Sequence, residues 1–500
     1  MPYIYATQAL AASVVAFVAI RKWGKRELPY PPGPKGYPVI GNVLDIPRDV
    51  SPWEGFASMA QKYGTDVLRL NLLGVNIIVL SSEEAISNLV DQRSAIYSDR
   101  PNMPMMRLMG LMDWALSLLP YGEKWRSYRK LFHEILNVRT AENFDDHQHK
   151  RTHNFLRRLL NSPENFEDDI TFLSGSLIMS IAYGMDVRSV DDPYLKATTD
   201  AMEDVKLAVV PGAFLVDIFP ILRYLPSWFP GGGFKKIAEE VRNNLAVSVN
   251  GPMAYVKETM KSGESFQHSV VSSYLSRLEY FEQRGHDETA IRDIAGIIFV
   301  GANETTTTAL LAFFLIMVLN PHVMRKAQDQ LDQVVGRERL PEYSDMKDLP
   351  YLSAIIKELL RWSPPLPLGF PKRVMQDDTY NGHFIPAGAT IIENLWEVLR
   401  NPKMFPEPEK FDPERYLKDG KIDPSVFEPE RRVFGSGRRI CPGKHFALRT
   451  LYLNIACVLS VFDIEAPLGE DGKPQLPSGE FDKAASRCEL SWRRFLLPHG

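Results

Sequence analysis

Cysteine is scarce in this sequence, and its scarcity excludes two classes of protein. The 500 residues contain 3 cysteines, at positions 441, 457 and 488. So few cysteines argue against a secreted, disulfide-stapled protein and favour a reducing compartment. Because no two of them follow the Cys-x2-Cys spacing, a structural zinc site is also excluded.

Other common signatures are missing as well. The net charge is −4, and no basic run is interleaved with aromatic residues, so nucleic acid is not a partner. No Gly-x-Gly-x-x-Gly fingerprint is present, which leaves no dinucleotide-binding unit. Beyond residue 30 there is no repeat and no low-complexity tract. A hydrophobic content of 45% then indicates a globular protein with a substantial core.

An apolar run opens the chain. Tyr3 to Ile20 is followed by positive charge, and roughly 18 residues at about 1.5 Å each reach about 27 Å, enough for a thin bilayer. A cleaved signal peptide would carry charge before the run and a small-x-small site after it; a buried helix is the other alternative. We predict a membrane anchor at 1–24 with the main domain in the cytosol. The positive residues are Arg21, Lys22, Lys25 and Arg26.

The next segment is rich in proline from Pro29 to Pro34. Proline forbids helix and stiffens an extended chain. We predict a hinge at 25–36, followed by one large domain at 37–500. An ordinary Pro-rich linker would have the same structure.

Most of the large domain shows helical periodicity. Short alternating stretches at Val67–Leu73 and Asn76–Leu80 predict strands. The fold is therefore predicted to be mainly α with a small β part. The predicted helices are Glu123–Leu136, Phe144–Leu160, Ile291–Leu319, Val323–Val335 and Tyr351–Trp362.

One cysteine lies in an unusual loop, from Phe434 to Gly443, with glycines and arginines around it. The glycines let the backbone turn sharply and approach a flat ligand. A helical segment starts at Lys444, and its N-terminus would favour the thiolate of Cys441. Such a thiolate suits the iron of a haem. A buried structural cysteine is the alternative, whereas a Cys-x5-Arg phosphatase loop is excluded because Ala447 stands where the arginine would be.

This loop resembles the haem-ligand loop of the cytochrome P-450 (haem-thiolate monooxygenase) family, Phe-Gly-x-Gly-x-Arg-x-Cys-x-Gly, at every constrained position. The resemblance covers roughly residues 29 to 490. It implies the haem-thiolate monooxygenase fold and haem b (iron protoporphyrin IX) as cofactor. Cys441 would be the axial ligand of the iron, in a loop shaped by Phe434, Gly435 and Gly443.

A second motif lies within the longest apolar helix candidate, where Gly301, Ala302 and Asn303 precede Glu304 and four threonines. The Thr305 hydroxyl can bond to the carbonyl of Gly301 and open the helix for a water. A core or transmembrane helix that tolerates polar residues is the alternative. The segment is similar to the family's oxygen-activating helix, Ala-Gly-x-(Asp/Glu)-Thr-Thr, with the first two positions exchanged. The resemblance implies that Thr305 and Glu304 deliver protons.

Two further sets of residues take roles from the resemblance. Glu358 and Arg361 share a helix face and resemble the family's Glu-x-x-Arg pair, which locks onto a later arginine, here Arg415; all three would be structural. Cations should also meet the haem propionates, although a surface arginine is the default reading of each. The matching positions are Trp125, Arg129, Arg373 and Arg439.

The substrate is predicted to be a lipophilic small molecule. Methionines between 103 and 112 suit an adaptable apolar pocket, with a plain core as the alternative, and the family places a substrate-contacting loop there. By the same analogy 209–234 covers the pocket. The overall sequence resembles fungal (basidiomycete) secondary-metabolism members, which favours a terpenoid over a polyketide, an alkaloid or an aromatic xenobiotic. The predicted substrate contacts are Met103, Met106, Met109, Gly301, Ala302, Leu366 and Leu368.

The electrons for reducing dioxygen must come from another protein. The resemblance implies an NADPH-dependent flavoprotein reductase, with cytochrome b5 as a second donor, and a single-pass endoplasmic-reticulum location facing the cytosol. Hydroxylation is the expected reaction. A reductase-independent thiolate-haem isomerase or peroxygenase and a non-enzymatic haem-binding membrane sensor are the alternatives.

Overall fold

The computed structural model describes residues 28–47, 49–209, 213–263, 267–466, 474–475 and 496–498. The predicted membrane anchor, 1–24, lies outside the described residues, as does the first part of the predicted hinge. The described part of the hinge is extended and lies against the body. The carbonyl of Pro32 accepts from the amide of Arg69 at 2.8 Å, and a Cβ at Gly33 would meet the Arg69 carbonyl oxygen at 1.9 Å, so only glycine fits there.

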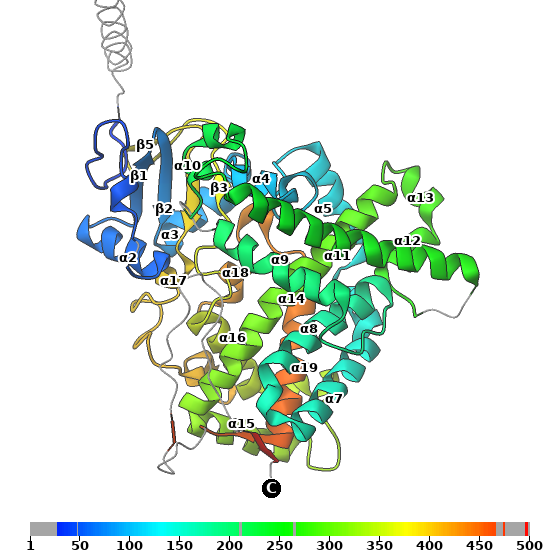
Figure 1. Ribbon diagram of the computed structural model, residues 1–500. Helices are drawn as coiled ribbons and strands as arrows, with labels where there is room; N and C mark the ends of the chain where they lie inside the picture. Colours follow the sequence, from blue (N-terminus) through cyan, green and yellow to red (C-terminus); the bar gives the residue numbers. More distant parts are fainter. Residues whose placement is uncertain are drawn as a thin grey trace, which may run out of the picture.

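Helices make up most of the molecule (Figure 1). The mainly α prediction is confirmed, and every helix predicted from periodicity is present with small shifts at its ends. The longer helices are α2 (Pro52–Lys62), α5 (Glu123–Ile135), α7 (Asp145–Asn161), α8 (Phe166–Tyr183), α9 (Pro193–Val209), α11 (Phe234–Ser262), α14 (Glu288–Leu319), α15 (Pro321–Val334), α16 (Pro350–Trp362) and α19 (Lys444–Val461).

Short helices connect the long ones. The α-helical ones are α3 (Glu83–Ile86), α4 (Pro104–Leu108), α6 (Val138–Ala141), α10 (Leu215–Ile218), α12 (Val270–Leu275), α13 (Leu278–Glu282), α17 (Leu395–Val398) and α18 (Glu430–Val433). A π-helical turn, η2, spans Ser87–Gln92. The 3-10 turns are η1 (Val43–Asp45), η3 (Leu111–Asp113), η4 (Glu142–Phe144), η5 (Pro163–Asn165), η6 (Pro220–Tyr224), η7 (Tyr343–Asp348), η8 (Pro413–Tyr416) and η9 (Gly437–Arg439).

One four-stranded sheet lies at the edge of the helical body, in the order β1 (Val67–Leu72), β2 (Val75–Leu80), β6 (Thr390–Glu393) and β3 (Lys372–Arg373). Strand β2 pairs antiparallel with β1 and parallel with β6. Successive side chains point to opposite faces, so each face of the sheet has its own apolar cluster. The two-stranded sheets are β4 (Asp378–Tyr380) with β5 (His383–Ile385), β7 (Leu417–Lys418) with β8 (Lys421–Ile422), and β9 (Phe462–Ile464) with β10 (Leu496–Pro498).

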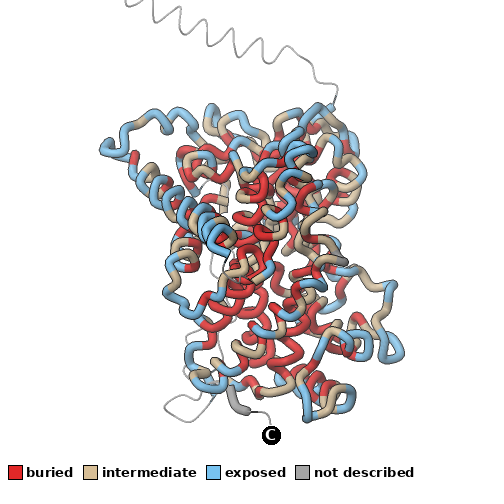
Figure 2. Tube along the Cα trace, turned by 90° about the vertical axis from the view of Figure 1, so that its right-hand side faces the viewer, coloured by how far each residue is buried: buried red, intermediate tan, exposed pale blue. Residues whose placement is uncertain are grey.

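Helix α14 is the central element of the core. Its C-terminal half packs with α7, α8, α15, α16 and α19 in the largest apolar cluster, and Figure 2 shows buried residues concentrated in the interior. Among the described residues it is the one helix long and apolar enough to span a membrane, but 78% of its most apolar window is buried. That burial is typical of the core helix of a globular protein.

Candidate active site

The loop around Cys441 runs between α18 and α19 and is closed by its own backbone. The amide of Cys441 donates to the carbonyl of Phe434 at 2.6 Å. Gly435 and Gly437 have φ of +83° and +61°, a region that favours glycine. A Cβ at Gly437 would also meet the carbonyl oxygen of Val90 at 2.3 Å. The prediction of a sharp turn is confirmed at these two positions, and Gly443 also lies in a turn, although its φ of −88° is one that any residue can adopt.

The electrostatics of Cys441 differ from the expectation. Its thiol is exposed, and it does lie just before the N-terminus of α19. Although the residue is accessible, protein atoms surround the sulfur, and the resulting desolvation raises the pKa of the thiol against the lowering effects of the Gly443 amide, Arg129 and Lys444. The Gly443 amide, Arg129 and Lys444 therefore favour the thiolate as expected, and a metal cation bound to the sulfur would favour it further. The other described cysteine, Cys457, is buried within α19.

Cations gather beside this loop. Arg439 stacks on Trp125 with 4.6 Å from guanidinium carbon to ring centroid, and it donates to the carbonyls of Ser98 and Leu119, both at 2.8 Å. Burial and the neighbouring Arg100 lower the pKa of Arg439 to about 8. A buried guanidinium held by carbonyls and facing a second cation is a site that an anion would stabilise.

The other predicted cations lie in two different settings. Arg129 is half-buried near Cys441, and within the described part of the chain no side chain or carbonyl forms a hydrogen bond or ion pair with it. Arg373 is 49% exposed and forms an ion pair with Asp99 at 3.4 Å. Arg129 thus has its donors available for an anion, whereas Arg373 already has a carboxylate partner.

Helix α14 borders open space at its predicted motif. Gly301 and Thr305 lie on one face and are accessible, and a Cβ at Gly301 would meet one atom within 4 Å, Cδ1 of Ile297 at 4.0 Å. The Thr305 hydroxyl donates to the carbonyl of Gly301 at 3.0 Å, as predicted. The predicted local opening is wrong, because the helix continues unbroken from Glu288 to Leu319.

The carboxylate of Glu304 lies in the interior, between α14 and α9. It is 6% exposed and forms an ion pair with Lys206 of α9. A buried carboxylate is costly unless it is paired, so this lysine explains how Glu304 is tolerated in an apolar helix. Lys206 carries no local motif, and sequence reasoning missed it.

We expect Lys206→Met to reduce the free energy of unfolding by roughly 3 kcal/mol, because it leaves the Glu304 carboxylate buried and unpaired. The matched control is Lys196→Met on the same helix. Lys196 pairs with Asp200 at 3.3 Å on the surface, and its loss should cost less than about 1 kcal/mol. Chemical denaturation of the three proteins measures the difference, and equal losses would contradict the role given to the buried pair.

The predicted substrate contacts are distributed among three apolar clusters, with Leu366 outside them. Met103, Met106 and Met109 are buried with residues of α9 and α11 and with Val300, next to Gly301. Leu366 is half-buried, whereas Leu368 packs against the sheet cluster. Ala302 packs with Trp125 and with Phe446 of α19. The motif of α14 therefore lies close to the helices that carry the cation site and the cysteine loop.

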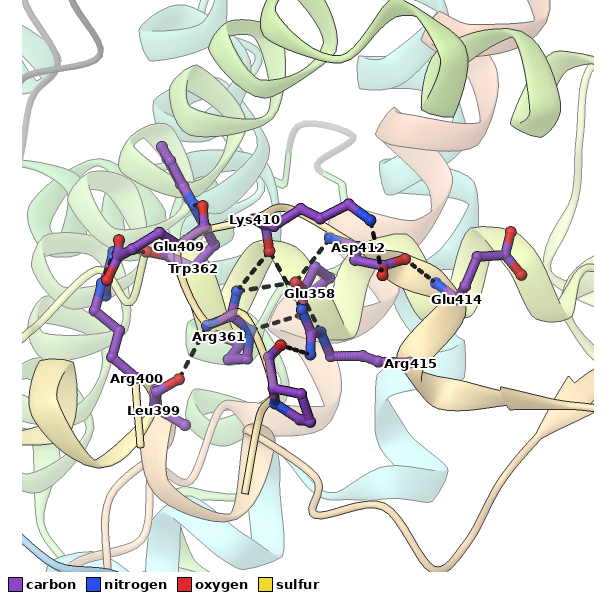
Figure 3. Close-up of polar contacts among 11 residues, drawn as sticks. Glu358, Arg361, Trp362, Leu399, Arg400, Glu409, Lys410, Asp412, Glu414 and Arg415 are labelled. Atoms are coloured by element: carbon purple, nitrogen blue, oxygen red, sulfur yellow. Dashed lines mark hydrogen bonds and ion pairs between the residues drawn. The ribbon is translucent and has the colours of Figure 1, made fainter. Parts of the chain in front are cut away.

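Glu358, Arg361 and Arg415 form one buried ion cluster (Figure 3). Both carboxylate oxygens of Glu358 accept from Arg361, at 2.7 and 2.9 Å, and one also accepts from Arg415 at 3.1 Å. The two arginines then donate to the carbonyls of Leu399, Pro406 and Lys410. The predicted contact of the helix pair with the later arginine is confirmed.

The sequence matches the family model for Cytochrome P450 over residues 31–490. The chain belongs to the cytochrome P450 family. It is 40% identical over 475 residues to Cytochrome P450 monooxygenase COX2 of Coprinopsis cinerea, and the aligned region covers 94% of this chain and 89% of that relative. It is 39% identical over 448 residues to Tryptamine 4-monooxygenase of Psilocybe cyanescens, covering 89% and 88%. Cytochrome P450 monooxygenase 98 of Postia placenta is 36% identical over 471 residues, covering 94% and 90%.

This P450 is thus a monooxygenase, and its family binds haem b through a cysteine thiolate. The described residues fit that group. An accessible thiol lies in a closed loop, and α14 borders open space at Gly301. The cations beside the loop that have no carboxylate partner among the described residues could bind the acidic propionates of a haem. Arg100, which sequence reasoning missed, adds to this charge and is held by the carbonyls of Ser117 and Pro371, both at 2.6 Å.

Proposed function

We propose that this P450 hydroxylates a neutral lipophilic small molecule, with Cys441 as the axial ligand of the haem iron. The observation that carries the proposal is the accessible thiol of Cys441 in its closed loop, close to unpaired cations. Arg129 and Arg439 would bind the haem propionates, with Trp125 packed against Arg439 and Arg373 at the edge of the site. When bound, haem supplies the chemistry of dioxygen reduction.

Thr305 and Glu304 would handle protons in this proposal. The Thr305 hydroxyl is accessible beside the open space at Gly301 and is oriented by its bond to the Gly301 carbonyl. Glu304 is buried nearby and is paired with Lys206 of α9. A buried carboxylate and an accessible hydroxyl on the same helix can relay a proton to the open space beside Gly301 when a water molecule bridges them.

A neutral substrate is favoured by the apolar residues that lie next to Gly301. Roof residues of α4, α9 and α11 form an apolar cluster. Glu304 and Asp217 are among the carboxylates near it. Glu304 is paired with Lys206, and Asp217 accepts from the Met105 amide at 2.8 Å while burial raises its pKa to about 6. The methionines and other apolar residues of this cluster suit an adaptable apolar pocket, so we propose a terpenoid-like substrate before an amine such as tryptamine.

The electron donor and location complete the proposal. We propose an NADPH-dependent flavoprotein reductase, or cytochrome b5 for the second electron, and a single-pass anchor in the endoplasmic reticulum membrane. The apolar run at 3–20 supports the anchor. Exposed apolar side chains on the segment that covers the pocket, among them Ile221, Tyr224 and Trp228, support contact with a bilayer.

The test is coupled turnover of the full chain with a reductase. Product should require both NADPH and reductase, and Thr305→Ala should raise NADPH consumed per product about tenfold or more, because proton delivery is worth at least that. Thr305→Ser keeps the hydroxyl and should stay coupled. Thr307→Ala, which removes a buried hydroxyl bonded to the Asn303 carbonyl, is the matched control. Unchanged coupling in Thr305→Ala would refute the role of this hydroxyl.

A further inference from the structure

The cysteine loop is held by a second group of ions, distinct from the Glu358 cluster. Within the described residues, the polar contacts of Glu358, Arg361 and Arg415 end on the segment 399–415 and do not reach the loop. A different set of side chains does reach it. We call this set the sheet-side anchor, and its members are Glu83, Asp91, Lys372, Glu393, Arg432 and Ser436.

The first arm of the sheet-side anchor comes from the four-stranded sheet. The Ser436 hydroxyl donates to one carboxylate oxygen of Glu393 at 2.6 Å. The other oxygen of Glu393 is paired with Lys372 on the neighbouring strand β3. Ser436 is 1% exposed, and both charged partners are buried. The third residue of the loop is therefore bonded to strand β6 in a setting without competing water.

The second arm comes from α3 and the π-helical turn η2. Arg432, which precedes the loop, donates to Glu83 at 2.6 Å and to Asp91 at 2.7 Å. The other oxygen of Asp91 accepts from the amide of Gly437 at 2.7 Å. Arg432 also donates to the Ser436 hydroxyl at 3.2 Å, which joins the two arms.

These contacts fix both halves of the turn that leads to the cysteine. Ser436 and Gly437 lie between Phe434 and Cys441, whose backbone groups close the loop. Gly437 has positive φ and is in close contact with Val90 of η2, so the loop cannot slide along this turn. A buried ion network of this kind adds little net stability over an apolar core of the same shape, and a positioning role is a better account of its presence.

We propose that Glu393, acting through Ser436, and Asp91, acting through Arg432 and Gly437, are positioning residues that set where the sulfur of Cys441 lies. This inference rests on the proposed role of Cys441. Loosening either arm lets the loop shift, so that the sulfur of Cys441 would no longer be held where it can bind the haem iron as a thiolate.

The experiment measures the ligand state of the haem-loaded full chain, not its activity. The reduced carbon monoxide complex has different spectra with a thiolate and with a thiol ligand, and the rate of conversion between the two is followed under mild heating. Ser436→Ala removes the shared hydroxyl and leaves each ion pair in place. Asp91→Asn keeps an oxygen for the Gly437 amide and weakens the contact with Arg432. We expect each to convert about tenfold faster than wild type, the factor for one buried hydrogen bond.

The matched control is Ser460→Ala. Its hydroxyl bonds to the carbonyl of Cys457 at 2.9 Å within α19, away from the loop, and the conversion rate should stay at the wild-type value. Wild-type rates in fully loaded Ser436→Ala and Asp91→Asn would overturn the inference. If Ser436→Ala does not retain haem, Asp91→Asn decides by the same criterion. A wild-type protein that binds haem without the thiolate spectrum would instead refute the proposed ligand, and the inference with it.

Discussion

Cys441→Ala is expected to abolish the thiolate-type spectrum of the reduced carbon monoxide complex and to reduce product formation below detection. Cys441 is the exposed one of the two described cysteines, and no other thiol is present in the loop that closes on Phe434. Alanine has no group that can bind iron, and the electron density that a thiolate supplies is then lost. Absorbance of the purified, reduced protein under carbon monoxide measures the effect directly.

The control for this substitution is Cys457→Ala. Cys457 is buried in α19, and burial raises its pKa to about 12, so it stays a neutral thiol in the core. Its replacement should leave the spectrum unchanged and cost about 1 kcal/mol of stability. A thiolate spectrum that survives in Cys441→Ala and disappears in Cys457→Ala would show that the ligand has been misassigned.

Glu358→Gln is expected to destabilise the protein by about 3–5 kcal/mol, enough to prevent accumulation of folded, haem-loaded material. Glu358 and Arg361 are both 0% exposed, and Arg415 bonds to the same carboxylate (Figure 3). Removing the negative charge leaves two guanidinium groups close together without a compensating charge. Loss of one partner of a buried ion pair lowers the free energy of unfolding by about 3–5 kcal/mol. Thermal and denaturant unfolding, together with haem content, give the measurement.

Glu409→Gln is the control from the same region. Glu409 pairs with Arg400 at 3.4 Å but is 73% exposed in its side chain, so solvent screens the interaction and the loss should be below about 1 kcal/mol. Similar stability of Glu358→Gln and Glu409→Gln would contradict the structural role of the buried cluster.

Local sequence was sufficient for the helices and for part of the site. Periodic apolar residues predicted α5, α7, α14, α15 and α16. Each of these helices buries one face against the core, and the spacing of its apolar residues identifies that face. The cysteine loop was equally readable, since glycines and arginines spaced closely around one cysteine suit few kinds of site besides a thiolate ligand. The bond from Thr305 to the carbonyl of Gly301 spans four residues and could likewise be foreseen.

Several local expectations failed where the surroundings decided the outcome. The position of Cys441 before a helix predicted a thiolate, but burial outweighs the helix terminus and raises the pKa of the thiol. Helix α14 was expected to open at its threonines. It continues unbroken, although the hydroxyls of Thr305, Thr307 and Thr308 each donate to a carbonyl four residues earlier within the helix.

The sequence by itself determined the family and the candidate site: one cysteine loop, one acid–threonine pair in an apolar helix and a helical scaffold around them. Only the tertiary structure decided their partners. Lys206 behind Glu304, the carbonyls around Arg439 and the sheet-side anchor of the loop all come from segments far apart in the chain. The physical reason is that a pairing between two buried charges depends on where helices and strands pack, and that information lies in the whole core and in no single stretch of residues.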